Sequence, residues 1–135
     1  MKRTFKDVTL KQTVALPLAA NTTCTNSIDL GTTAPFAVTE DFHVRVTVDT
    51  ATGANSKNVN AVLQASNEST ANFVNIAGLG APILVAAGNA ANVIGSNVTV
   101  QLPPNLDKQY IRASCTGEAN GGNAADGNLT VELLF

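Results

Sequence analysis

The sequence predicts an all-β fold, a single antiparallel β-sandwich or barrel of about eight short strands. Apolar and polar residues alternate with a period of two in five stretches, as they do in strands that bury one face and expose the other. Clusters of Gly, Asn, Ser and Asp separate these stretches, as turns do. No stretch has a convincing helical period, because the Ala-rich segment 85–95 contains Gly88 and Gly95.

The five strongest strand candidates share clear alternation and are, in order, 42–48, 59–66, 97–104, 110–115 and 129–135. In the first of them, Phe42, Val44, Val46 and Val48 fall on one face. Weaker candidates fill the gaps at 7–14, 26–31, 72–77 and 82–87. This number of short strands in 135 residues indicates a sandwich or a barrel.

The stretch 101–115, QLPPNLDKQYIRASC, predicts a corner between two strands. Pro103 and Pro104 have no backbone N–H to give to a sheet, so they end the strand that runs through Leu102. The chain then turns, and Tyr110 begins the next strand. The prolines have a structural explanation here and need no catalytic one.

Length and composition indicate one domain, residues 1–135, with a neutral and hydrogen-bonding surface. Charged residues make up only 13% of the chain, against roughly 25% in ordinary soluble domains. The polar remainder is mostly Asn, Thr, Ser and Gly, which suits contact with other protein. The net charge of −2 gives no basic footprint for nucleic acid.

The basic residues are unevenly distributed. Lys2, Arg3, Lys6 and Lys11 are half of the eight in the chain, and Asp7 is the one acidic residue among the first eleven. Such a segment could dock on an acidic protein, or it could be a solvated terminus.

Localisation signals and disulfides are not evident. No apolar run of a secretion leader or of a membrane span is found, because Pro17 interrupts the best candidate. We therefore expect synthesis in a reducing cytoplasm, with Cys24 and Cys115 as free thiols. A disulfide between them stays open at this stage, since it depends on geometry.

The residues offer little for catalysis. His43 is the single histidine, and it lies within a strand where a surface role is the ordinary one. No Cys or His pair has metal-ligand spacing, and no serine lies in a nucleophile elbow. We expect no enzyme, no cofactor and no metal. A calcium site near Glu40 and Asp41, with the turn residues Asp49, Asp107 and Asp126, is the metal alternative.

Aromatic side chains that could form a sugar-binding platform are few. The chain has no Trp, one Tyr and five Phe, of which Phe42 and Phe135 fall on apolar faces. The aromatic residues left for an exposed platform are Phe5, Phe36, Phe73 and Tyr110.

Three pieces in order resemble the capsid cement, or decoration, proteins of tailed bacteriophages, which have a jelly-roll β-sandwich. The first is the small polar run before Ile28, Asp29, Leu30 and Gly31. The second is the alternating pair of strands within 42–76, joined by a loose loop. The third is 98–135, with a Leu-Pro-Pro corner, an aromatic-Ile-Arg strand, a glycine-rich loop and a final strand. Together they cover nearly the whole chain, whereas the basic start differs from the family.

The resemblance implies a structural virion protein with a jelly roll, and the uneven charge of this chain adds to it the expectation of a basic N-terminal arm. It would bind the outer surface of an icosahedral head, bridge capsomers of the major capsid protein and stabilise the mature shell. The protein would be made in the host cytoplasm and would form a homodimer or homotrimer, with no nucleic-acid or membrane partner. The alternative is a non-catalytic binding sandwich of a tail, a fibre or a carbohydrate-binding module. Residues expected in a capsid-docking arm are Lys2, Arg3, Phe5, Lys6 and Lys11.

Overall fold

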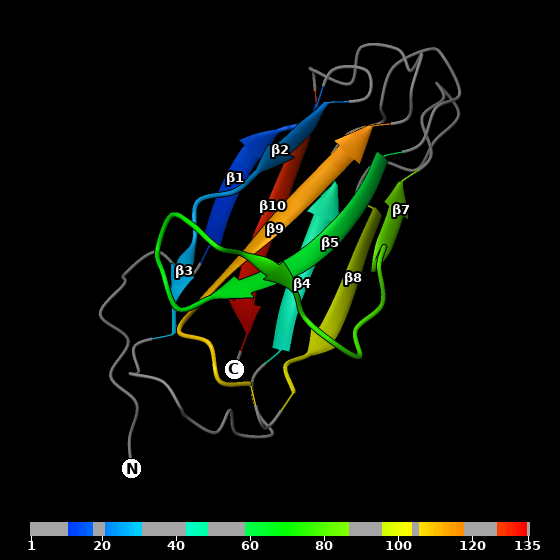
Figure 1. Cartoon of the computed structure of the whole chain (residues 1–135). Helices are drawn as coiled ribbons and strands as arrows, with labels where there is room; N and C mark the ends of the chain where they lie inside the picture. Colours follow the sequence, from blue (N-terminus) through cyan, green and yellow to red (C-terminus); the bar gives the residue numbers. More distant parts are fainter. Residues whose placement is uncertain are drawn as a thin grey trace.

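A computed structural model describes residues 11–17, 21–30, 43–48, 59–86, 96–103, 106–117 and 127–134. These residues form two antiparallel sheets that lie face to face, with no helix among them (Figure 1). The strands are β1 (Lys11–Ala15), β2 (Thr22–Cys24), β3 (Ile28–Asp29), β4 (His43–Val48), β5 (Val59–Ser66), β6 (Val74–Asn75), β7 (Leu84–Ala86), β8 (Ser96–Gln101), β9 (Tyr110–Gly117) and β10 (Asn128–Leu134).

Sheet 1 has the strand order β1-β10-β4-β8. Its centre is the pairing of β10 with β4, in which Val131 lies opposite Val46. Because side chains alternate along a strand, Val44, Val46 and Val48 all point inward, and each is at most 1% exposed. The alternation in the sequence thus sets which face of the sheet is buried.

Sheet 2 has β9 and β5 at its centre and a broken strand at each edge (Figure 1). On one side β2 and β3 both pair with β9, and Thr25–Ser27 lie between them. On the other side β6 and β7 both pair with β5, at Gln64–Ala65 and at Val59–Ala61. The segment between β6 and β7 contains Gly78 and Gly80 with positive φ angles of 86° and 91°, which glycine adopts without strain.

The strands pair in a nested order, the first with the last and the inner strands with one another. In this comparison each broken edge of sheet 2 is counted as one strand. The first strand, β1, pairs with the last, β10, and β2 pairs with β9. Within them β4 pairs with β8, and β5 pairs with β6 and β7. The chain therefore passes back and forth between the two sheets, and the sandwich is built almost entirely from contacts distant in sequence.

The core fills the space between the sheets with small and branched apolar side chains. Its largest members below 2% exposure include Ile28, Leu30, Leu102, Ile111 and Leu129. Burying a side chain of this size stabilises the fold by roughly 1.5–3 kcal/mol. The core is thus large enough to hold the sandwich together without a disulfide.

The predicted β-sandwich is confirmed, and so are the strands expected within the described residues. Two differences concern the edges. The strand β2 was not expected, because Thr22–Cys24 is three residues long and carries no apolar alternation. The described strands number ten rather than about eight, because each edge of sheet 2 is split in two.

The corner predicted at 101–115 is present. β8 ends at Gln101, Leu102 is buried, and the Leu106 N–H donates to the Pro103 carbonyl over 3.1 Å. β9 begins at Tyr110 as expected, after the chain has crossed from sheet 1 to sheet 2.

Candidate interaction surface

The predicted docking arm falls mostly outside the described residues, which begin at Lys11. Lys2, Arg3, Phe5 and Lys6 are therefore not described. Lys11 is the first residue of β1, lies exposed, and faces Glu132 of β10 in the register of sheet 1. It is thus part of the sandwich, and an arm could include only residues before it.

The outer face of sheet 1 is polar and carries one row of alternating charge. Lys11, Glu132 and Arg45 lie side by side across β1, β10 and β4. An Arg45 nitrogen is 3.9 Å from a Glu132 oxygen, and the side chains are 45% and 36% exposed. An ion pair so exposed contributes little to stability, at most about 1 kcal/mol. The row carries a net charge of only +1.

His43 starts β4 and lies on the same outer face, half-buried. Its neighbours in register are Leu134 on β10 and Gln101 on β8. Neither is a nucleophile or an acid, so the strand pairing gives His43 no partner of a catalytic triad.

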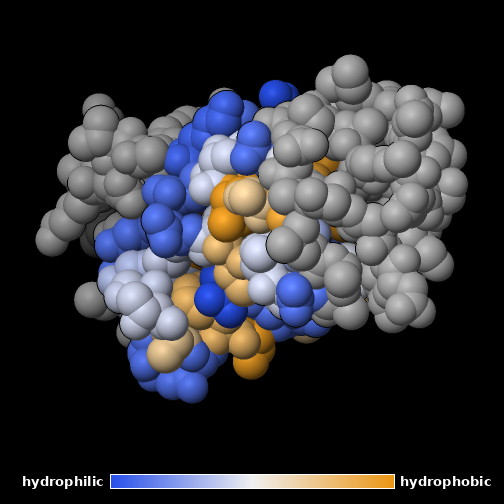
Figure 2. Space-filling model, turned by 90° about the horizontal axis from the view of Figure 1, so that it is seen from above, coloured by the Kyte–Doolittle hydropathy of each residue, from blue (hydrophilic) through white to orange (hydrophobic). Residues whose placement is uncertain are grey.

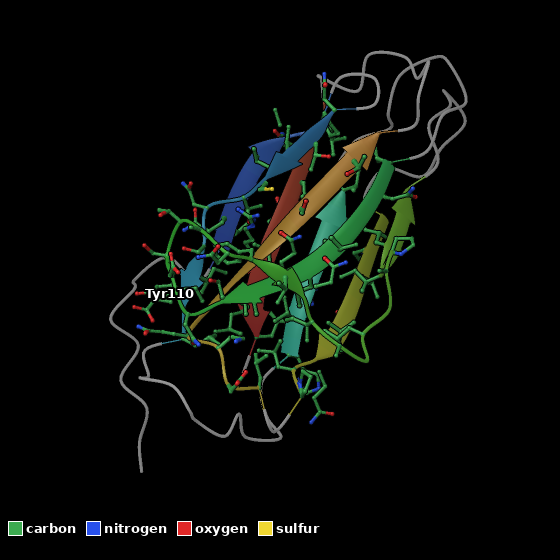
Figure 3. The ribbon with its side chains drawn as sticks, viewed as in Figure 1. Tyr110 is labelled. Carbon is green, nitrogen blue, oxygen red and sulfur yellow. The ribbon has the colours of Figure 1, made fainter. Side chains whose placement is uncertain are left out.

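Sheet 2 carries a hollow of about 440 Å³ on its outer side, between the broken edge and the loop that follows β5. The hollow is lined by Cys24, Thr25, Asn26, Ser27, Ser69, Thr70, Phe73 and Arg112. Arg112 is the one charged residue among them, and Figure 3 shows the polar side chains gathered at this end of the sheet, on the side of the labelled Tyr110.

One wall of the hollow exists because Thr25 interrupts the edge strand. The Thr25 N–H donates to the Ala113 carbonyl over 2.9 Å, and the Thr25 hydroxyl oxygen accepts from the Ala113 N–H over 3.0 Å. The Thr25 hydroxyl thus accepts the hydrogen bond that a backbone carbonyl of the edge strand would otherwise accept. Thr25 itself is buried, with 4% of its surface exposed. The chain bulges at Asn26 and Ser27 before β3 resumes the pairing.

The other wall is the loop 67–73, which several side chains hold in place. The Ser66 hydroxyl donates to the Ala71 carbonyl over 2.6 Å and accepts from the Glu68 N–H over 3.0 Å. The Ser27 hydroxyl donates to the Ser69 carbonyl over 2.8 Å, which ties this loop to the opposite wall. Both walls are therefore fixed before any partner binds.

Arg112 lies between the two walls on β9. Its Nε donates to Gln64 Oε1 over 3.0 Å, and Gln64 Nε2 donates in turn to Asn75 Oδ1 over 3.2 Å. The guanidinium carbon lies 4.1 Å from the centre of the Phe73 ring, a cation–π contact. The guanidinium is thus held on one side by an amide and on one face by a ring.

Of the four aromatic residues left for an exposed platform, Phe73 and Tyr110 are described, and neither is fully exposed. Phe73 is half-buried and has the Arg112 guanidinium over its ring, so that face is not open to a sugar. Tyr110 is half-buried at the start of β9, in register with Asp29 and Ser66 (Figure 3). Phe5 and Phe36 lie outside the described residues.

The two cysteines are free. Cys24 is half-buried on the outer side of sheet 2, where its thiol lies 3.5 Å from the Ser114 hydroxyl. Cys115 is completely buried. Burial raises the pKa of the Cys115 thiol to about 12, and the nearby Cys24 thiol adds to the shift.

A second hollow, of about 270 Å³, lies beside β6 at the corner that follows β8. Its apolar lining comes from Ala65, Val74, Ile76, Ala77, Pro103 and Leu106. Val74 is 57% exposed, whereas Val44 and Val46 of the core are fully buried. On the upper face of the molecule, which Figure 2 shows, apolar groups are likewise visible between hydrophilic ones.

The calcium alternative depends largely on residues that are not described, namely Glu40, Asp41, Asp49 and Asp126. Asp107 is described and exposed, and its carboxylate lies 3.7 Å from the Lys108 ammonium. No group of three potential metal ligands occurs within the described segments. The structure thus brings no acidic cluster together there.

The sequence matches no protein-family model and no curated protein. Among the described residues, no helix is long and apolar enough to cross a membrane.

Proposed function

We propose that this protein is a non-catalytic capsid cement protein of a tailed phage, with a jelly-roll fold. It would bind the outside of the mature head and hold neighbouring capsomers together. The nested strand pairing is the observation that carries this proposal, with the resemblance of three sequence pieces beside it.

The strand order supports the jelly-roll part of the proposal. A jelly roll results when a long antiparallel ribbon of eight strands is rolled up, so that strands one and eight, two and seven, three and six, and four and five pair. With β2–β3 and β6–β7 each counted as one strand, the pairs β1–β10, β2–β9, β4–β8 and β5–β6 follow this scheme.

Two of the sequence pieces that resemble cement proteins, the early one and the closing one, pack against each other, which further supports the proposal. Ile28 and Asp29 of the early piece pair with Ile111 and Tyr110 of the closing piece. Gln109 Nε2 donates to Asp29 Oδ1 over 3.0 Å, and the Leu30 N–H donates to the Gln109 carbonyl over 2.8 Å. The early signature and the aromatic-Ile-Arg strand thus form one structural unit, although about 80 residues separate them.

The surface is suited to contact with protein at several points. The outer faces of both sheets carry mainly Thr, Ser, Asn and Gln, and the described charges are few. Each contact of such a surface is modest, but several contacts made by one module reinforce each other through effective concentration. A closed homodimer or homotrimer would add further points and would cover strand edges such as β6.

The test is co-sedimentation of the purified protein with mature heads of tailed phages that lack a decoration protein. We expect saturable binding, and release of the packaged DNA at a higher temperature once the heads are coated. A well-folded protein that leaves all heads unbound and their release temperature unchanged would contradict the proposal. Glycan-array screening would then test the alternative of a carbohydrate-binding or fibre module.

A further inference from the structure

We propose that the hollow around Arg112 binds a carboxylate, namely an acidic side chain of a partner protein. That the partner is the major capsid protein rests on the proposed function, whereas the chemistry of the hollow does not.

The donors of Arg112 are the first argument. A guanidinium carries five N–H groups, and its planar fork fits a carboxylate with two parallel hydrogen bonds. In the described part of the chain, Arg112 uses its Nε–H for Gln64 and forms no ion pair. Arg112 lines the hollow, and no hydrogen bond to another described residue uses its Nη donors, so they are available to an incoming carboxylate.

The second argument is that Arg112 is already held in position. The Phe73 ring supports one face of the guanidinium, and the chain from Arg112 through Gln64 to Asn75 fixes its rotation. An arginine held in this way loses less side-chain entropy when it binds than a free surface arginine does. Arg45 lacks such support, since its described contact is a 3.9 Å ion pair in solvent.

The third argument is the charge of the lining. No acidic residue lines the hollow, so the Arg112 charge is not neutralised from within it. The nearest acidic residue of the adjoining loop, Glu68, accepts a hydrogen bond from Asn72 Nδ2 over 2.6 Å. Of the four hydroxyls in the lining, those of Thr25 and Ser27 already donate to backbone carbonyls. The hydroxyls of Ser69 and Thr70 are the ones that could donate to a bound carboxylate.

A side chain of a docked protein fits this site better than a free small anion. A single partly exposed ion pair contributes at most about 1 kcal/mol, which gives a free carboxylate a dissociation constant of only about 0.2 M. A carboxylate on a partner that other contacts already hold binds at a high effective concentration. The hollow would then add both affinity and orientation to a larger interface.

The first experiment compares Arg112→Gln with Arg45→Gln in the capsid-binding assay. Both substitutions remove one positive charge, but Arg45 lies on the outer face of the other sheet. We expect Arg112→Gln to weaken binding about fivefold, and Arg45→Gln to change it less than about twofold. Equal effects of the two variants, or none from Arg112→Gln, would overturn the proposal while leaving the cement function standing.

The second experiment uses Cys24 as a reporter, because Cys24 is one of the residues that line the hollow. Bound capsids should slow the alkylation of Cys24 by a small maleimide severalfold. An unchanged rate at saturating capsid would show that the hollow stays open in the complex, against the proposal. A Cys115→Ala background leaves Cys24 as the only thiol in the chain.

If no capsid binds, the carboxylate chemistry is tested on the free protein by NMR. The probes are a capped Gly-Gly-Glu-Gly-Gly peptide and its Gln counterpart, each at tens of millimolar. We expect the Glu peptide, and not the Gln peptide, to shift the Arg112 Nε–H resonance. A shift without capsid binding would refute the cement role alone, and no shift from the Glu peptide would refute the site.

Discussion

The thiols of Cys24 and Cys115 lie on opposite faces of sheet 2, although the two residues belong to adjacent strands. Cys24 faces Ser114 in the pairing of β2 with β9, so Cys115 is opposite Thr23, one position along. Successive side chains of a strand alternate between faces, which sends the Cys115 thiol into the core and the Cys24 thiol outward. A disulfide within one molecule would require a change of register.

This arrangement predicts two very different thiol reactivities. In the folded protein, Cys24 should react with a maleimide within minutes at neutral pH, whereas Cys115 should react only when the sandwich opens. The thiolate is the nucleophile, and a pKa of about 12 leaves buried Cys115 almost entirely protonated. Mass spectrometry of the labelled protein should show one modification without denaturant and two in urea. Cys24→Ser should abolish the rapid modification, and two rapid modifications would contradict the assigned register.

The raised pKa of Cys115 also predicts a loss of stability at alkaline pH. Above the ordinary thiol pKa of 9.0 the unfolded chain releases a proton that the folded protein keeps until about pH 12. Unfolding is therefore favoured by up to about 1.4 kcal/mol per pH unit between these values, while below pH 9 the contribution is constant. Urea unfolding at several alkaline pH values, with reductant present, measures the slope. The result is the difference in slope between the unmodified protein and Cys115→Ala, because this difference cancels the contributions of all other groups; the variant should be less sensitive to pH.

The hydroxyl of Thr25 should contribute to stability through the bond that it accepts from the Ala113 N–H. Thr25→Val keeps the shape and the β-branching but leaves a buried N–H without its acceptor, which costs about 1–3 kcal/mol. Thr22→Val is the matched control, since the Thr22 hydroxyl bonds to Thr116 at an exposed position. Chemical denaturation should show a loss below about 0.5 kcal/mol for the control. Similar losses for both variants would mean that the Thr25 hydroxyl has no special role at the broken edge.

Two valines, one in the core and one on an exposed edge strand, allow the effect of burial on stability to be compared. Val46 is fully buried in the centre of sheet 1, and Val74 is 57% exposed on β6. Val46→Ala should lower the free energy of unfolding by about 2 kcal/mol, whereas Val74→Ala should change it by less than about 0.5 kcal/mol. Urea titrations of the two variants compare the same chemical change at two burials. A large loss from Val74→Ala in the isolated protein would show that the second hollow is part of the core.

The strands of the sandwich could be predicted from the sequence because their alternation is local. Val44, Val46 and Val48 alternate with polar residues along the chain, and this alternation alone indicates that the three valines share one buried face. The strand β2 gives no such signal, because its three residues are held by pairing with β9 and not by an apolar face. Edge strands are often short and polar, so sequence patterns identify them poorly.

The hollow around Arg112 could not be predicted for a related reason. Arg112 meets Gln64 only because β5 and β9 pair in one particular register, and Phe73 reaches the guanidinium only because loop 67–73 folds back over sheet 2. The sequence did suggest Phe73 as a surface aromatic, but gave no sign that a cation would lie on its ring. Contacts between residues tens of positions apart depend on the assembled fold, which periodicity does not determine.

The position of Lys11 sharpens the test of the proposed docking arm. Lys11 belongs to β1 and pairs with Glu132, so a deletion of residues 1–11 would remove an end of sheet 1 together with the arm. Deletion of residues 1–10 leaves β1 complete, and we expect it to weaken capsid binding severalfold while changing the urea midpoint little. If the charge of the arm matters rather than its length, the triple variant Lys2→Gln, Arg3→Gln, Lys6→Gln should weaken binding about as much as the deletion. Added salt should then weaken binding of the intact protein more than binding of the deleted protein. His43→Ala, which alters the outer face of β4, is the control and should bind like the unmodified chain in the same assay. Full binding by the deleted protein would rule out the arm.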